Sequence, residues 1–215
     1  MDARVKKVVP PFARKSRKLS LTRAERAGLV KGRIFDAAVK VVGQFGYSEA
    51  TVSRITKEAG VAQGTFYNHF PNRQSLLDQL LPTVGEQLLD YIRPKVNHIK
   101  GEAEKEDARF HAFFQFLIEM PQFMRILNEA QVFAPDGYEK HINAVLKNYT
   151  RTLHKNGVGA DFSNEELQVM VHIMMGLRSY LSMTYSYTNN TVHLPESAVY
   201  STYSKLMRSG LFGKS

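Results

Sequence analysis

The sequence contains no cysteine, and no uninterrupted apolar run reaches the roughly 18 residues that a membrane span needs. Without cysteine the chain has no disulfide, no thiolate metal site and no thiol nucleophile. Its basic start, residues 1–18, has only Val8 and Val9 before two prolines, so it lacks the apolar segment of a signal peptide. We therefore expect a protein of the reducing cytoplasm without a membrane anchor.

The motifs of several enzyme classes are also absent. The chain has no Gly-x-Ser-x-Gly elbow, no phosphate loop, no dinucleotide-binding glycine motif and no His-Glu-x-x-His. Its seven histidines include no i, i+4 pair that would place two metal ligands on one helix face. We predict that the protein is not an enzyme and needs neither a metal nor a cofactor.

What is present is the composition of a folded domain with one basic end. The 215 residues are 43% hydrophobic and include 13 Phe and 10 Tyr, enough for a core. Eleven of the 29 Lys and Arg lie in residues 1–33, against two of the 20 acidic residues. Such a block favours nucleic acid as a partner, since each cation near a phosphate releases counterions. A solvated tail or a patch for anionic lipid is the alternative.

The segment from residue 34 to residue 71 predicts a helix-turn-helix. A first helix ends at Gly46 and has one apolar face, formed by Ile34, Ala37, Ala38, Val41, Val42 and Phe45. A two-turn helix follows the N-cap Thr51 and stops before Gly60, and a third segment runs from Gln63 to Phe70 until Pro71. Two short helices joined by a glycine-containing turn are typical of this motif.

The outward face of the third segment has the composition of a DNA-recognition helix. It carries hydrogen-bonding side chains and no acid, namely Gln63, Thr65, Tyr67, Asn68 and His69. Gln and Asn pair bidentately with adenine, a Thr methyl meets the thymine methyl, and hydroxyls bind phosphates. Gly64 permits close approach of the backbone. The pattern therefore predicts that this segment enters a major groove.

These residues resemble the DNA-binding domain of the tetracycline-repressor-like (TetR) family, above all in the run from Gly60 to Phe70. The resemblance implies base contacts by Gln63, Gly64, Thr65 and Asn68, and phosphate contacts by Thr51, Ser53, Tyr67, His69 and Arg73. For His69 a structural hydrogen bond, and for Tyr67 a place in the core, are the alternatives. Where the family often has Ser or Thr this chain has Ala62, so the recognition helix lacks a side-chain N-cap.

The chain beyond this motif predicts further helices and therefore an all-α protein. A long helix from Asn72, kinked at Pro82, connects the motif to the rest. Helices are expected at residues 102–120, 122–132, 138–155, 163–187 and 195–209. The expected divisions are a flexible basic arm (1–21), a helix-turn-helix DNA-binding domain (22–75) and a helical ligand-binding and dimerisation domain (76–215). The predicted DNA contacts of the arm are Arg14, Lys15, Arg17 and Lys18.

The two C-terminal helices are candidates for a homodimer interface. The helix at 163–187 is apolar almost all round, which favours burial on more than one side. The last helix has a stripe of its own, formed by Val199, Tyr200, Tyr203, Leu206 and Met207. The resemblance implies dimerisation through these two helices; the alternative is that they close a monomeric core.

Aromatic residues between Phe110 and Phe133 predict either core packing or a ligand cavity. The resemblance implies a small effector in the larger domain. The candidate pocket residues are Phe113, Phe123, Asn128, Tyr138, His141, His172 and Arg178. Arg178 is a cation in a nearly apolar helix and needs either a carboxylate partner or an anionic ligand.

We therefore expect a ligand-responsive transcriptional regulator. As a repressor it binds a palindromic operator in double-stranded DNA as a homodimer, and a small, largely apolar effector releases it. The alternative is a constitutive or architectural DNA-binding protein without an effector.

Overall fold

The computed structural model describes residues 22–155, 157, 162–188 and 191–210. Within these ranges the chain forms helices and one short pair of strands, in which β1 (Tyr187–Thr188) pairs antiparallel with β2 (Thr191–Val192). The helices are α1 (Arg23–Phe45), α2 (Val52–Ala59), α3 (Gln63–Tyr67), α4 (Arg73–Val96), α5 (Glu102–Glu119), α6 (Phe123–Phe133), α7 (Pro135–Lys155), α8 (Asn164–Tyr185) and α9 (Ser197–Ser209). The expected all-α fold is confirmed.

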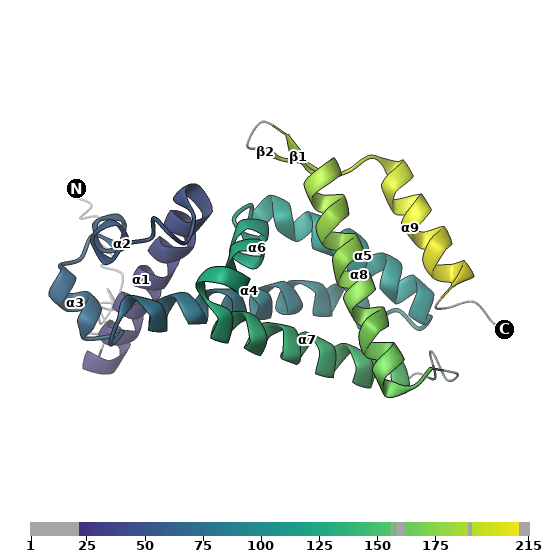
Figure 1. Cartoon of the computed structure of the whole chain (residues 1–215), viewed down its shortest axis with the longest axis horizontal. Helices are drawn as coiled ribbons and strands as arrows, with labels where there is room; N and C mark the ends of the chain where they lie inside the picture. Colours follow the sequence, from purple (N-terminus) through teal and green to yellow (C-terminus); the bar gives the residue numbers. More distant parts are fainter. Residues whose placement is uncertain (1–21, 156, 158–161, 189–190, 211–215) are drawn as a thin grey trace, which may run out of the picture.

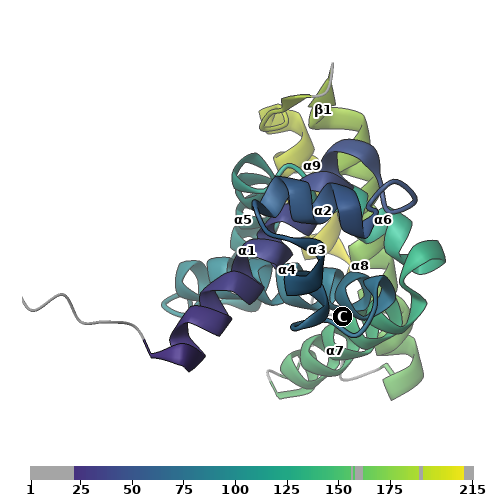
Figure 2. The same cartoon turned by 90° about the vertical axis from the view of Figure 1, so that its left-hand side faces the viewer.

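The helices form a small head, α1 to α3, and a larger body, α5 to α9, which α4 joins (Figure 1). α4 begins beside α3, packs against α1 and continues into the body between α5, α6 and α7. Viewed from the head, the first turns of α1 project beyond the other helices (Figure 2). The orientation of the head therefore depends on α4 and on the contact between α1 and α6.

Side-chain caps fix the starts of the helices around the head. Thr51 caps α2, because its Oγ1 accepts a hydrogen bond from the Arg54 N–H at 3.2 Å. Asn72 caps α4 in the same way, with Oδ1 2.8 Å from the Ser75 backbone nitrogen. Ala62 gives α3 no side-chain cap. All three findings agree with the sequence-based expectation.

Three helix boundaries differ by more than two residues from those expected. α1 begins at Arg23 instead of near Ile34, because residues 23–33 include good helix formers behind a capping box, although they carry no buried stripe. α7 begins at Pro135 instead of Tyr138, since proline suits the first turn of a helix. α3 ends at Tyr67, and the chain from there to Phe70 forms a turn.

One apolar core passes from the head into the body. Ile34, Ile55, Phe66 and Phe70 are buried in the head. α4 continues this core without a break in the helix at Pro82, and its buried residues there are Leu76, Leu77, Leu80, Leu81 and Val84. No helix in the described ranges has the length and apolarity that crossing a membrane requires.

Candidate functional site

The surface of α3 and its flanks carries most of the predicted DNA contacts. Phe66 and Phe70 are buried and hold this segment against the head. The outward side chains are Gln63, Tyr67 and Asn68, which are exposed, with Thr65 and His69 half-buried beside them. Tyr67 is 55% exposed and therefore does not lie in the core. Ahead of them, Thr51 and Ser53 at the start of α2 are also exposed.

Gly64 lies on the same surface, and a Cβ added there would meet nothing within 4 Å. The backbone of α3 is therefore open to another molecule at this position.

Arg73 stabilises the loop between α1 and α2. Its Nε donates to the Ala50 carbonyl at 2.8 Å, and its Nη2 donates to the carbonyls of Tyr47 and, at 3.4 Å, Ser48. The resemblance implied a phosphate contact for this residue, but in the structure its guanidinium holds the loop that leads into α2. A planar fork with several donors suits this arrangement, since one side chain satisfies several carbonyls.

A polar clamp joins α6 of the body to the head. Glu129 accepts a hydrogen bond from the Tyr47 N–H at 2.8 Å. Arg125 pairs with Glu129 at 2.8 Å, and its Nη1 donates to the carbonyls of Gly43 and Gln44 at 3.3 and 3.0 Å. We call this contact the α6 clamp.

Gly46 makes the close approach of the α6 clamp possible. Its φ is +87°, and a Cβ there would lie 2.9 Å from both the Arg125 guanidinium and the Glu129 carboxylate. Any side chain at this position would therefore be strained and would push the clamp apart.

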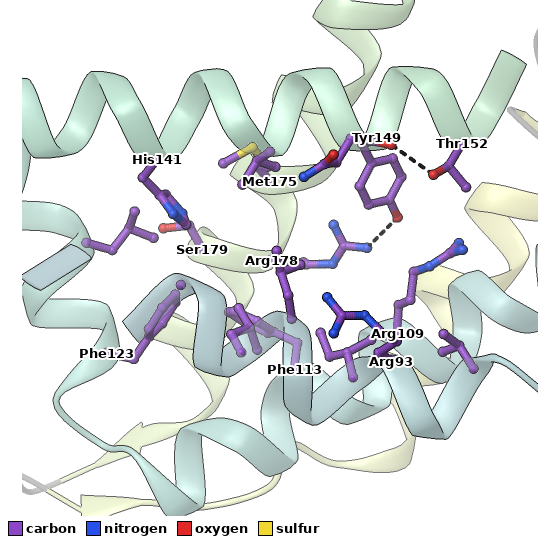
Figure 3. A pocket seen from close by; sticks show the side chains of 18 of the residues that line it. Arg93, Arg109, Phe113, Phe123, His141, Tyr149, Thr152, Met175, Arg178 and Ser179 are labelled. Atoms are coloured by element: carbon purple, nitrogen blue, oxygen red, sulfur yellow. Dashed lines mark hydrogen bonds between the residues drawn. The ribbon is translucent and has the colours of Figure 1, made fainter. Parts of the chain in front are cut away.

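The body contains a cavity of about 380 Å³ between α4, α5, α6, α7 and α8 (Figure 3). Its apolar walls are formed by Leu88, Leu89, Ile92, Phe113, Phe123, Leu127, Val145 and Met175. Arg93, Arg109 and Arg178 gather at one end, and His141 lies at the other, near Phe123. An apolar chamber with cations at one end fits an elongated ligand with an anionic end.

A buried carboxylate neutralises the innermost of these arginines. Glu106 on α5 is fully buried and accepts hydrogen bonds from Arg178, from the Tyr149 hydroxyl and, at 2.7 Å, from the Tyr203 hydroxyl. Arg109 lies 3.5 Å from the same carboxylate. These five residues, which we call the Glu106 network, connect α5, α7, α8 and α9.

Burial and charge act together on the groups of this network. Burial, with the nearby Glu106 carboxylate, raises the pKa of Tyr149 to about 12. Burial opposes the charge of Arg178, but Glu106 together with Tyr203 and Tyr149 outweighs the burial and keeps the pKa of Arg178 well above its ordinary value. Arg178 is therefore a charged side chain whose partner is a carboxylate of its own chain.

His141 gives the other end of the cavity a neutral polar group. It is only 8% exposed, and burial lowers the pKa of its imidazole to about 4. The ring packs against Gly85 of α4, where a Cβ would collide with it. At neutral pH His141 therefore presents an uncharged donor and acceptor to the cavity.

Four of the predicted pocket residues, Phe113, Phe123, His141 and Arg178, line this cavity. Asn128 and His172 do not, because both lie on exposed helix faces: Asn128 contacts Met183, and His172 contacts the Gln168 carbonyl. Tyr138 does not line it either and packs half-buried against the core.

Among the aromatic residues of this region, Phe110 belongs to the core, where its ring stacks on Tyr203 at 3.6 Å. Four further residues that line the cavity, Tyr149, Arg93, Arg109 and Arg151, were not predicted, because none of them belongs to a recognisable pattern in the sequence. In the part of the chain that the structure describes, no group of three or more acidic or histidine side chains is arranged to hold a metal ion.

The outer face of α8 carries an exposed apolar stripe. Val169, Ile173, Tyr180 and Met183 are 59%, 49%, 67% and 47% exposed, and Gly176 lies open between them. Steps of four and three residues are the spacing of a helix seam that packs against another helix.

α9 differs from the expectation, because Val199, Tyr203 and Met207 are buried and α9 packs against α5. Of its predicted stripe only Leu206 is exposed, since Tyr200 is half-buried.

Comparison with known proteins finds a family model that matches most of the head and the start of α4. Residues 34–80 match the profile described as bacterial regulatory proteins, tetR family. The chain is 29% identical over 122 residues to the fatty acid metabolism regulator protein of Bacillus subtilis, covering 56% of this chain and 62% of that protein. It is 31% identical over 81 residues to the transcriptional regulator CymR of Pseudomonas putida, covering 38% and 40%. These alignments span less than two thirds of either relative.

Solved structures show that the fold extends over the body. The fatty acid degradation regulator FadR of Bacillus halodurans superposes with a TM-score of 0.66 at 23% identity, covering 84% of this chain and 98% of that one. The transcriptional regulator FadR of Bacillus subtilis, solved in complex with stearoyl-CoA, gives 0.64 at 20% identity, covering 83% and 98%. The resemblance to TetR-family transcriptional regulators is confirmed over the residues of the helix-turn-helix, and the solved structures confirm the fold.

Proposed function

We propose that this chain is a transcriptional repressor that binds a palindromic operator as a homodimer and is released by a long-chain acyl thioester. The observation that carries the proposal is the position of α6. Phe123 and Leu127 on this helix line the cavity, while Arg125 and Glu129 hold the head. One rigid helix therefore connects a ligand chamber to the DNA-binding surface.

The DNA-binding half of the proposal follows from the size of α3. This helix has five residues and so contacts only a few base pairs. A dimer doubles the contact, and two α3 helices in successive major grooves require half-sites about 34 Å apart. The exposed stripe on α8 supplies the apolar face that such a dimer needs. The arm residues Arg14, Lys15, Arg17 and Lys18 lie outside the described residues, and their contribution to affinity through phosphate contacts is part of the proposal.

The effector class follows from the cavity. Its walls are apolar and its cations lie at one end, which suits an acyl chain attached to an anionic group. The relative from Bacillus subtilis that shares this fold was solved with stearoyl-CoA. We therefore place acyl thioesters of coenzyme A before other amphipathic acids.

Release operates through a difference in affinity between two positions of the head. An acyl chain against Phe123 and Leu127 displaces α6, and the α6 clamp passes the displacement to the backbone between Gly43 and Tyr47. A ligand that prefers the displaced form by about 100-fold shifts the equilibrium by about 2.7 kcal/mol. That shift suffices to release the protein from an operator whose binding is only modestly stronger than is needed for occupancy.

Base contact and phosphate contact are separable by mutation. We expect Gln63→Ala and Asn68→Ala each to weaken specific operator binding by about 1–3 kcal/mol and to relax the preference at particular bases. Tyr67→Phe removes only a hydroxyl proposed to contact phosphate, so it should weaken all sequences alike. Selection of bound sequences from random DNA measures the difference. Unchanged preferences in the Gln63 and Asn68 variants would remove these residues from the base-contacting set.

Filling the cavity should weaken release by the effector. Ile92 lines the cavity, whereas Ile118 on α5 is 43% exposed and lies outside it. We expect stearoyl-CoA to release operator DNA from the wild type and from Ile118→Trp, and Ile92→Trp to need about 100-fold more ligand. Fluorescence anisotropy of labelled operator DNA during the titration measures this. If stearoyl-CoA and free fatty acids all fail to release the wild type, the constitutive DNA-binding protein is the correct function.

A further inference from the structure

A second hollow, of about 480 Å³, lies between α7 and α8. In Figure 1 it corresponds to the end of the body where the last turns of α7 approach the start of α8. Its lining is Asn143, Leu146, Lys147, Thr150, Arg151, His154, Asn164 and Gln168. Only one of these side chains is aliphatic, so the hollow differs in character from the apolar cavity beside it.

Basic side chains line one wall of this hollow without acidic partners. Lys147, Arg151 and His154 follow one another at i, i+4 and i+7 and therefore share a face of α7. Among the described residues none of the three pairs with a carboxylate, and the one polar contact of the Arg151 guanidinium is the Asn148 side chain at 3.3 Å. By contrast, Arg93 and Arg178 of the neighbouring cavity are paired with Asp90 and Glu106. Unpaired cations in a concave surface attract an anion from solution.

A buried hydroxyl in the same hollow has no partner. Thr150 is 7% exposed, and its Oγ1 makes no hydrogen bond in the structure. Buried hydroxyls are almost always paired, because an unpaired one loses its hydrogen bonds to water without replacement. Thr150 therefore places an unpaired polar group in the wall of the hollow.

The two hollows share one lining residue, Arg151, at the edge between two faces of α7. A single ligand that passes over Arg151 can extend its apolar chain into the cavity and its polar end into the hollow between α7 and α8. Arg151 and Lys147 suit phosphate oxygens, because guanidinium and ammonium groups form charge-assisted hydrogen bonds with them.

We propose that the hollow between α7 and α8 binds the phosphate groups of the effector whose acyl chain occupies the cavity. This inference rests on the proposed function and deepens it, since it makes the phosphates of the thioester carrier, and not only the acyl chain, part of what the protein recognises. A free fatty acid then fills the cavity but leaves the hollow empty.

The test compares two ligands with the same chain on the full-length protein. Isothermal titration calorimetry is used with stearoyl-CoA and with stearate. We expect Lys147→Gln/Arg151→Gln to bind stearoyl-CoA about 10- to 100-fold more weakly than the wild type does, because two charge-assisted contacts are lost. Its affinity for stearate should fall much less, because of the two substituted residues only Arg151 lines the cavity. Lys140→Gln/Lys155→Gln removes two cations of the same helix that line neither hollow, and should bind both ligands like the wild type. Lys147→Arg/Arg151→Lys keeps both charges and should retain most of the affinity for stearoyl-CoA.

The outcomes separate this inference from the proposed function. If the wild type binds neither ligand, the proposed function fails. If it binds both, and the Lys147/Arg151 variant loses nothing with stearoyl-CoA or loses equally with stearate, only the phosphate site fails. Competition with coenzyme A and with inorganic phosphate completes the test. Coenzyme A should compete more strongly than inorganic phosphate at equal concentration, and equal competition would assign the hollow to free phosphate and overturn the proposal.

Discussion

Replacing Glu106 with alanine should lower the free energy of unfolding by about 3–5 kcal/mol, the range measured when one partner of a buried ion pair is removed. Arg178 would keep its charge in a place where its side chain is only 11% exposed. The hydroxyls of Tyr149 and Tyr203 would lose their acceptor at the same time. Urea unfolding at several protein concentrations measures the change and separates it from any change in association.

Glu104 is the matched control for this experiment. It lies on the same helix and pairs with Arg208, but its side chain is 54% exposed, so solvent screens the pair. Glu104→Ala should therefore cost far less than Glu106→Ala. Equal losses in the two variants would show that the Glu106 network contributes nothing beyond a surface ion pair. Glu106→Gln keeps one acceptor oxygen, enough for one of the two hydroxyls, and should fall between the wild type and the alanine variant.

Ile173→Asp should convert the proposed dimer into a monomer and weaken operator binding by about 1,000-fold, equivalent to about 4 kcal/mol. Ile173 lies in the middle of the α8 stripe, between Val169 and Tyr180. In a two-fold interface the substitution occurs twice, so two carboxylates are placed against apolar side chains. A monomer then holds one half-site with a single α3 helix. Sedimentation velocity and operator titration measure the two effects.

Ile118 again supplies the control. It lies on a different helix, and its exposed fraction of 43% is similar to the 49% of Ile173. Ile118→Asp should remain dimeric and bind the operator normally. A wild-type protein that sediments as a monomer at micromolar concentration and still binds a single half-site tightly would contradict the dimer. An Ile173→Asp protein that stays dimeric would move the interface away from the α8 stripe.

The head is the part that the sequence specifies most fully, because its determinants are local. Thr51 and Asn72 mark helix starts by side-chain capping, and Gly46 and Gly60 mark ends through backbone conformations that favour glycine. The phenylalanine pair Phe66 and Phe70 fixes which face of the segment is buried. Each of these relations spans only a few residues and is therefore visible in the sequence.

The Glu106 network shows why much of the body is not predictable in this way. Tyr149, Arg178 and Tyr203 lie 43, 72 and 97 residues from Glu106 along the chain. The need of Arg178 for a carboxylate follows from its apolar surroundings, but the choice among 20 acidic residues depends on how four helices pack. The exposed stripe of α8 could not be predicted for a different reason. Its buried and exposed faces are both apolar, so composition alone does not distinguish them.

The α6 clamp has a consequence for how such a protein diversifies. In the head, the groups that Arg125 and Glu129 contact are the backbone N–H of Tyr47 and the backbone carbonyls of Gly43 and Gln44. Every residue type offers these carbonyls, and every residue except proline offers the N–H. Side chains on the outward surface of α3 are therefore free to change without altering the contact, provided that Gly46 is kept. For the proposed repressor, operator preference and effector preference are thus modular traits, which gene duplication followed by drift can alter one at a time.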